Sequence, residues 1–250
     1  ATAAHVVSTR RSTTLGSGSA RIGTVEHLLA ALTGLGIDNA RIETPSREIP
    51  ILDGSAAPFV QAISAAGTVQ QDAPRLWLRP SREIEVTDPR SGAYIRIAPA
   101  DAPSLEVTVD YGSRVLGVQT VSLGPATDFA SQIAPCRTFC FLHEVMPQLL
   151  LGLARGGDAT NAIIIAERPV GPVRLKALAR IFGQPSLHVT PEGYLSNLAL
   201  RFPDEFGRHK LLDLLGDLRL AGGFLQARVT AYKPGHALNT SLSSQLFNKL

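Results

Sequence analysis

The sequence has little cysteine and no long hydrophobic run. Its only cysteines, Cys136 and Cys140, are too few for a disulfide scaffold and lack the second pair that a structural zinc site of this kind would need. We therefore expect a reduced, intracellular protein. The longest apolar runs, at 149–151 and 162–166, are far shorter than the ~20 residues of a membrane-spanning helix. No segment is expected to cross a membrane.

Charge is also scarce, at 18% of the 250 residues, whereas 44% are hydrophobic. This composition excludes a disordered chain and supplies ample material for a core. Lysine and arginine number 24 against 21 acidic residues, and so small a surplus, spread along the chain, argues against nucleic-acid binding. Residues 1–8 show neither a signal nor a transit pattern.

Apolar spacing predicts α-helices over 24–35, with Thr24 as N-cap, over 58–66, after Thr127, and over 203–220. Strand-like segments lie at 40–43, 75–78, 84–86, 94–97, 105–109, 162–166 and 227–232. The small polar stretch 67–74 suggests a domain boundary, which gives domains 1–74 and 75–250. The order is α+β in two blocks, without the βαβ alternation or glycine-rich motif of a dinucleotide-binding fold or P-loop.

One predicted helix carries three polar residues on a single stripe, because His209, Asp213 and Asp217 are spaced four apart. A histidine and an aspartate at this spacing can bind one metal from successive turns, and imidazole with carboxylate suits zinc. The alternative is an ordinary helical ion pair or a solvated face. Leucines already supply the apolar side of this helix, so the polar stripe faces something else.

A catalytic zinc usually takes three protein ligands and a water, so a third ligand and a base must come from elsewhere. Glu26 and His27 open the first predicted helix and point about 100° apart, so His27 suits a ligand and Glu26 a base. The alternative is a carboxylate that stabilises the helix N-terminus beside a half-buried histidine. The absence of H-E-x-x-H excludes a thermolysin-like arrangement.

Other polar residues allow a catalytic or a structural interpretation. His236 follows the strand 227–232 and the Pro234-Gly235 turn, where it would act as an exposed general acid oriented by Asp217 or lie simply on the surface. Thr138 would polarise an oxyanion or belong to a core strand. Residues 154–161 contain a Gly-Gly pair, which is explained by a tight loop that needs positive φ, without a catalytic role. His5, His143 and His188 are expected on the surface.

These segments together resemble the zinc-dependent UDP-3-O-acyl-N-acetylglucosamine deacetylases, which carry out the committed step of lipid A synthesis. The resemblance covers about Thr13 to Leu242, and its specificity lies in the order of its six blocks. The blocks are residues 24–32, 49–59, 137–139, 156–162, 200–218 and 231–238.

The resemblance implies a role for each matching residue. His27, His209 and Asp213 would hold one Zn²⁺ per chain, with Glu26 as general base, His236 as general acid, Asp217 as its orienter and Thr138 as oxyanion donor. Lys210 and Lys233 would contact the sugar and diphosphate, Tyr111 would lie near the uracil, and Phe139 and Phe141, with the segment to Leu153, would form the passage for the acyl chain. The implied fold is two α+β domains of similar sandwich architecture, packed face to face around the active site.

The implied activity is hydrolysis of the N-acetyl group of UDP-3-O-acyl-N-acetylglucosamine. The resemblance further implies a monomer in the cytoplasm, or in an organelle if the source is a eukaryote. Its lipid-like substrate would bring it near a membrane. Family sequences begin with a further stretch, so domain 1–74 is expected to be N-terminally incomplete, with an exposed sheet edge. Residues 170–198 form a longer connection than usual, and 158–160 differ from the family. The alternative is a truncated, non-catalytic relative that binds acylated nucleotide sugars or a partner.

Overall fold

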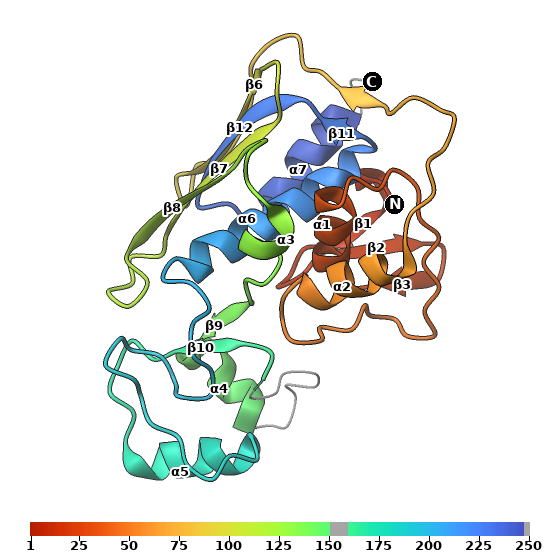
Figure 1. Ribbon diagram of the computed structural model, residues 1–250. Helices are drawn as coiled ribbons and strands as arrows, with labels where there is room; N and C mark the ends of the chain where they lie inside the picture. Colours follow the sequence, from red (N-terminus) through yellow and green to blue (C-terminus); the bar gives the residue numbers. More distant parts are fainter. Residues whose placement is uncertain (151–159, 248–250) are drawn as a thin grey trace.

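The computed structural model describes residues 1–150 and 160–247, with side chains outside 147–150 (Figure 1). The α-helices are α1 (Glu26–Gly34), α2 (Ala57–Ala66), α3 (Phe129–Gln132), α4 (Leu142–Leu150), α5 (Pro172–Ile181), α6 (Glu205–Leu218) and α7 (His236–Phe247). The strands are β1 (Val6–Ser8), β2 (Thr14–Ser17), β3 (Ala20–Ile22), β4 (Trp77–Leu78), β5 (Ile84–Asp88), β6 (Ala93–Pro99), β7 (Ser104–Asp110), β8 (Val118–Leu123), β9 (Phe139–Phe141), β10 (Ile163–Ile165), β11 (Phe224–Leu225) and β12 (Ala227–Tyr232). The mixture of helices and separate sheets confirms the α+β class.

The largest sheet has five strands in the order β5-β6-β12-β7-β8. Its central strand, β12, comes from the end of the chain and runs antiparallel to β6 and parallel to β7. In β7, buried Leu105, Val107 and Val109 alternate with more exposed Glu106 and Thr108. This period of two directs one face of the sheet toward the helices.

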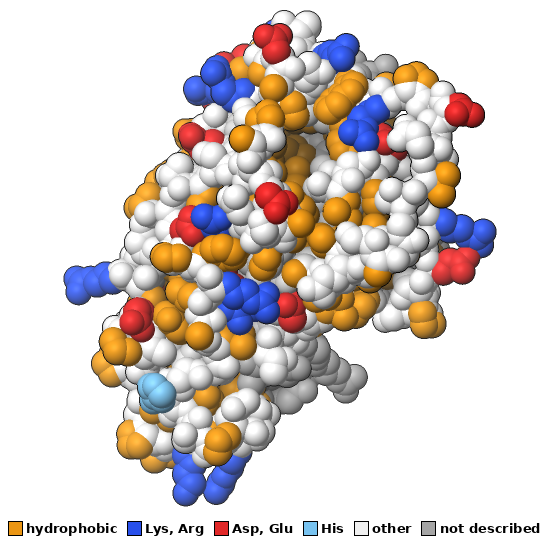
Figure 2. Space-filling view, viewed as in Figure 1, with side chains coloured by type: hydrophobic (Ala, Val, Ile, Leu, Met, Phe, Trp, Pro, Cys, Tyr) orange, Lys and Arg blue, Asp and Glu red, His pale blue; other side chains and the backbone are white. Residues whose placement is uncertain are grey.

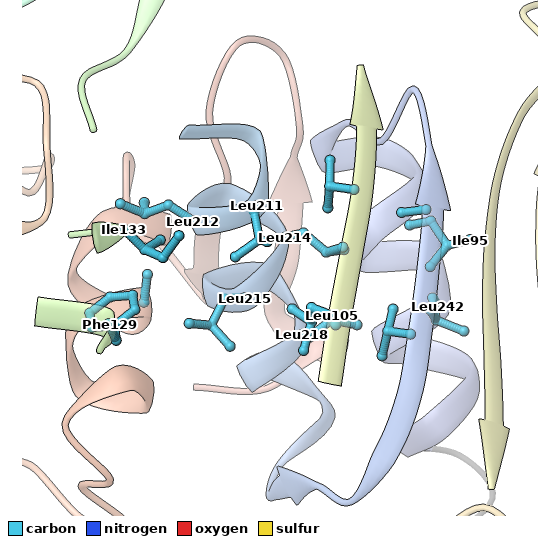
Figure 3. Packing of buried hydrophobic residues seen from close by; sticks show 14 of the residues in the cluster. Ile95, Leu105, Phe129, Ile133, Leu211, Leu212, Leu214, Leu215, Leu218 and Leu242 are labelled. Carbon is cyan, nitrogen blue, oxygen red and sulfur yellow. The ribbon is translucent and has the colours of Figure 1, made fainter. Parts of the chain in front are cut away.

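Helix α6 lies between that sheet and the rest of the molecule. Figure 3 shows Leu212 beside Ile133 on one side of α6 and Leu218 beside Leu105 on another, and all four belong to one buried cluster. Apolar side chains thus occupy two sides of the helix. Its polar stripe faces the remaining side, where α1 packs against it.

The first 74 residues form a three-stranded sheet, β1-β2-β3, with α1 and α2. Helix α1 approaches α6 backbone to backbone, because a Cβ atom on Gly216 would lie only 2.1 Å from the carbonyl oxygen of Glu26. The large core cluster joins Ala30, Ala56 and Val60 of this block to the leucines of α6. The division into domains 1–74 and 75–250 stays a prediction.

A smaller unit, with β9, β10, α4 and α5, lies below the two blocks in Figure 1. Its strands β9 and β10 pair in parallel, and α4 and α5 pack near them. Leu142, Ile164, Leu178 and Leu195 form its own buried cluster. The long connection 170–198 therefore contributes a helix and part of a core. The Gly156-Gly157 turn, residues 158–159 and the end of the expected acyl passage at 151–153 lie outside the described residues.

Two local predictions in the first block are wrong. Residues 40–43 form no strand, because no described segment pairs with their backbone. Thr24 does not cap α1: its backbone has a φ of 57°, and its hydroxyl donates to Glu48 Oε1 at 2.7 Å. The N-cap is Val25, so the helix begins at Glu26 without a side-chain cap.

The surface in Figure 2 carries lysine and arginine side chains in small groups, several beside acidic ones, and no continuous basic stripe crosses this face. His5, His143 and His188 are exposed, as expected. Within the described ranges, no helix combines the length and apolar character needed to cross a membrane.

Candidate metal centre and active site

Helices α1 and α6 bring three candidate ligands together. One donor atom each of His27, His209 and Asp213 lies within 4.8 Å of the others, and all three residues are buried. Asp213 Oδ1 is 3.6 Å from His27 Nε2 and 3.4 Å from His209 Nε2. The Gly216 contact produces this arrangement, since it sets α1 directly against the polar stripe of α6.

The donor set fits a cation. Nδ1 of His209 lies 3.0 Å from the carbonyl oxygen of Cys136, so Nδ1 carries the proton and the Nε2 lone pair faces the cluster. Among the described residues, Asp213 Oδ1 has no hydrogen-bond partner although it is buried. A buried, unpaired carboxylate oxygen between two imidazoles is costly without a positive charge. Two histidines and one aspartate suit Zn²⁺ and leave a coordination position open.

The charge states also favour a metal. Burial lowers the pKa of His209 to about 4, because the opposing charge of Asp213 does not compensate. Burial alone would raise the pKa of Asp213, but the charges of His209 and Lys210 hold it well below its usual value. At neutral pH the site therefore presents a neutral imidazole and an ionised carboxylate, the forms that coordinate metals.

Glu26 lies beside the cluster and is 2% exposed. Its Oε2 accepts a 3.0 Å hydrogen bond from the main-chain N–H of Thr13, and its Oε1 lies 3.9 Å from His236 Nε2. Burial raises the pKa of this carboxyl, opposed by the charges of His236 and His27. A desolvated carboxylate with a raised pKa is suited to accept a proton near neutral pH.

His236 is buried at the start of α7, so the prediction of an exposed loop position is wrong. Its Nδ1 donates to Asp217 Oδ2 at 2.9 Å, and Asn239 donates to the same oxygen at 2.9 Å. Burial lowers the pKa of His236, but the charge and hydrogen bond of Asp217 outweigh it and raise the pKa to about 9. The ring therefore carries a proton at neutral pH.

Several residues expected to bind substrate lie next to the cluster. Lys210 donates to Asp213 Oδ2 at 2.7 Å, with its Nζ 6.0 Å from the ring centre of Phe139. Tyr111 packs edge-on against Phe139 and Phe141, with ring centroids 5.7 Å apart in each pair. These three rings form an aromatic wall that reaches His209 through Phe139, at 6.3 Å between centroids.

Lys233 Nζ lies 3.3 Å from Oδ2 of Asp110, the residue that precedes Tyr111 in the sequence. Hydrogen bonds from the Tyr232 hydroxyl, the Gly112 N–H and Lys233 lower the pKa of Asp110 to about 2. The aspartate is therefore charged near neutral pH, and it forms an ion pair with the ammonium group of Lys233.

Thr138 immediately precedes β9, between Cys136 and Phe139, both of which contact His209. Its main-chain N–H donates to the carbonyl of Gly54 at 2.8 Å. The structure brings this threonine near the ligand set through its neighbours. Its role as oxyanion donor stays a prediction.

Sequence reasoning missed four residues that support the site. Thr13 contacts both Glu26 and Asp217, and Asn239 contacts Asp217. Arg137 and Glu205 form a buried pair, with Nε to Oε1 at 2.9 Å, that ties the start of β9 to the first turn of α6. No local spacing marks these residues, because each acts across a long stretch of sequence.

Comparison with known proteins identifies the family. The family model described as UDP-3-O-acyl N-acetylglycosamine deacetylase (LpxC) matches residues 1–177 and 184–248. The chain belongs to this family. A bifunctional enzyme LpxC/FabZ of Porphyromonas gingivalis is 42% identical over 97% of this chain and 53% of its own length. The UDP-3-O-acyl-N-acetylglucosamine deacetylases of Myxococcus xanthus and Anaeromyxobacter sp. are 42% and 43% identical over 69% and 70% of their lengths.

The chain spans about half the length of its bifunctional LpxC/FabZ relatives, which extend well beyond it. The matched part contains the whole ligand set, Glu26 and the His236–Asp217 pair. Family membership therefore agrees with the resemblance seen in the sequence. The individual residue roles are proposals.

Proposed function

We propose that the chain is a zinc-dependent deacetylase that releases acetate from UDP-3-O-acyl-N-acetylglucosamine. The observation that carries the proposal is the convergence of His27, His209 and Asp213 from two facing helices, with Glu26 on one side. Membership of the LpxC family supplies the substrate class. A cytoplasmic location, a monomeric state and proximity to the membrane stay predictions.

His27, His209 and Asp213 would hold the zinc ion. Zinc bound there would act as a Lewis acid and make a water molecule more acidic. Glu26 Oε1 would take the proton of the attacking water, since it is the carboxylate oxygen that Thr13 leaves free. His236 would give its Nε2 proton to the departing amine, and Asp217 would hold its ring through Nδ1.

The remaining residues would bind and polarise the substrate. Thr138 would donate its hydroxyl to the developing oxyanion. Lys210 and Lys233 would neutralise the diphosphate, because both are cations: Lys210 lies against Phe139 of the aromatic wall, and Lys233 pairs with Asp110 beside Tyr111 in the sequence. Phe139 and Phe141 would line the acyl passage, and Tyr111 would lie against the uracil.

The test measures metal content by elemental analysis together with acetate release from UDP-3-O-acyl-N-acetylglucosamine. We expect about one zinc per chain and zinc-dependent turnover in the wild type. His209→Ala should lose both, because it removes a buried ligand. Glu26→Gln should keep the zinc and lose about 10²- to 10⁴-fold in turnover, the usual contribution of general acid–base catalysis.

His188→Ala is the matched control, since His188 is exposed and belongs to a different unit. It should keep both zinc and turnover. A folded wild-type chain without stoichiometric zinc or acetate release would overturn the proposal and favour a non-catalytic relative. Turnover near the wild-type value in Glu26→Gln would remove the base assignment alone.

A further inference from the structure

Thr13 lies between the carboxylates of Glu26 and Asp217 and is fully buried just before β2. Its main-chain N–H donates to Glu26 Oε2 at 3.0 Å, and its hydroxyl donates to Asp217 Oδ1 at 2.6 Å. Its own carbonyl accepts from the N–H of Val25 at 3.3 Å. One residue thus contacts the expected base, the partner of the expected acid and the start of α1.

The hydroxyl helps to fix the plane of the Asp217 carboxylate relative to His236. A carboxylate has two equivalent oxygens and rotates easily unless each is held by a donor. Here Oδ1 is held by Thr13, and Oδ2 is held by His236 Nδ1 and Asn239 Nδ2. With donors on both oxygens the carboxylate has one orientation, and the imidazole has one as well.

The main-chain N–H does the same for Glu26. It occupies Oε2, so that Oε1 is the oxygen turned toward His236 Nε2, at 3.9 Å. The two contacts are chemically separate, because a side-chain substitution at Thr13 removes the hydroxyl and leaves the main-chain donor. The effect on Asp217 can therefore be tested without removing the bond to Glu26.

We propose that Thr13 is a positioning residue whose hydroxyl fixes Asp217, and through it the imidazole of His236, for proton transfer. The inference rests on the proposed function for its kinetic consequence. Its structural part, the orientation of His236 by way of Asp217, does not depend on turnover.

The kinetic test compares Thr13→Val, which keeps shape and loses the donor, with Thr13→Ser, which keeps the donor. Thr13→Val should lower kcat about 10- to 100-fold, a part of what acid–base catalysis contributes, with KM and zinc content unchanged. Thr13→Ser should have a kcat close to that of the wild type. Thr14→Val is the matched control, because it removes a hydroxyl from the next residue and should leave kcat unchanged.

The second test uses proton NMR of the metal-free protein and needs no substrate. The Nδ1 proton of His236 should give a low-field resonance that persists in wild type, Thr13→Ser and Thr14→Val, since Asp217 protects it from exchange. Thr13→Val should broaden or lose it. If Thr13→Val does not fold, Thr13→Ala replaces it, because alanine admits water instead of placing a methyl group against the carboxylate. The expected losses of kcat and of the resonance are the same.

A resonance that is unchanged in the folded variant without the hydroxyl would overturn the inference. A wild-type kcat in that variant, or a parallel change in its KM and zinc content, would also overturn the inference. The same holds if Thr13→Ser loses as much kcat as Thr13→Val. A wild-type chain without turnover would contradict only the proposed function, and the NMR comparison would still decide the role of Thr13.

Discussion

His209 and His236 have different charge states at neutral pH. Burial holds the pKa of His209 at about 4, whereas Asp217 raises the pKa of His236 to about 9 against the effect of burial. Burial lowers both pKa values, but the hydrogen bond and charge of Asp217 outweigh it for His236, whereas Asp213 is opposed at His209 by the charges of His27 and Lys210. The neutral ring suits a metal and the charged ring suits an acid.

This difference predicts a pH dependence of stability for the metal-free protein. Folded His236 keeps its proton up to about pH 9, whereas the unfolded chain releases it near its ordinary pKa of about 6.5. The folded state therefore binds more protons between these values, and its stability falls as pH rises through them. The loss should be on the order of 3 kcal/mol, measured by urea unfolding with a chelator present.

His236→Gln should remove most of this slope, because no titrating ring remains at that position. His188→Gln should keep it, since His188 is exposed. An unaltered slope in His236→Gln would show that other groups cause the pH dependence.

At this scale the sequence predicted the residues whose spacing is local. His209, Asp213 and Asp217 follow from the helical period, and Glu26 and His27 from their place at a helix start. Thr13 could not be predicted, because its partner Asp217 lies 204 positions away. Asn239 was not predicted either, since its helix was not predicted.

Among the elements, the contact between α1 and α6 decides the geometry of the ligand set. Gly216→Ala should push the helices apart, because its Cβ would meet the carbonyl oxygen of Glu26 at 2.1 Å. We expect weaker zinc binding, measured by chelator competition, and a loss of about 1–3 kcal/mol in stability from overpacking.

Gly207→Ala is the control within the same helix. Its Cβ would meet only side-chain atoms of Gln119 and Val121, at 3.2 Å or more, which can shift slightly. Helix propensity favours this change by up to about 1 kcal/mol. If Gly216→Ala binds zinc as tightly as Gly207→Ala, the backbone approach does not set the site.

Elements with a clear apolar period were predicted, and those without one were not. Helix α6 and strands β5 to β7 show strong patterns and lie where they were expected. Helix α7 was missed, because its buried side carries Asn239, Thr240 and Ser243, which weaken the hydrophobic period. Residues 40–43 alternate correctly, but a strand also needs a partner, which no local pattern reveals.

Over the whole molecule, one core joins the first block to the large sheet. Ala30, Ala56 and Val60 share a cluster with Leu78 and Leu214. The composition change at 67–74 suggested a boundary, but composition says nothing about which surfaces meet. Because the ligand set draws on both blocks, the site depends on this shared core.

The shared core predicts that damage in the first block destabilises the second. Trp77, the sole tryptophan, packs against Phe224 in the second block, next to buried Leu78. Val60→Ala should therefore lower the free energy of unfolding by about 1–3 kcal/mol, for the methyl groups removed and the cavity left, and so shift the urea midpoint of Trp77 fluorescence to a lower concentration. Val69→Ala should leave it unchanged, because Val69 is 89% exposed. If the blocks unfold independently, the fluorescence transition should stay unchanged in both variants. Circular dichroism would then detect an earlier loss of helix in Val60→Ala alone. Only a shared core can transmit the effect of the cavity to Trp77.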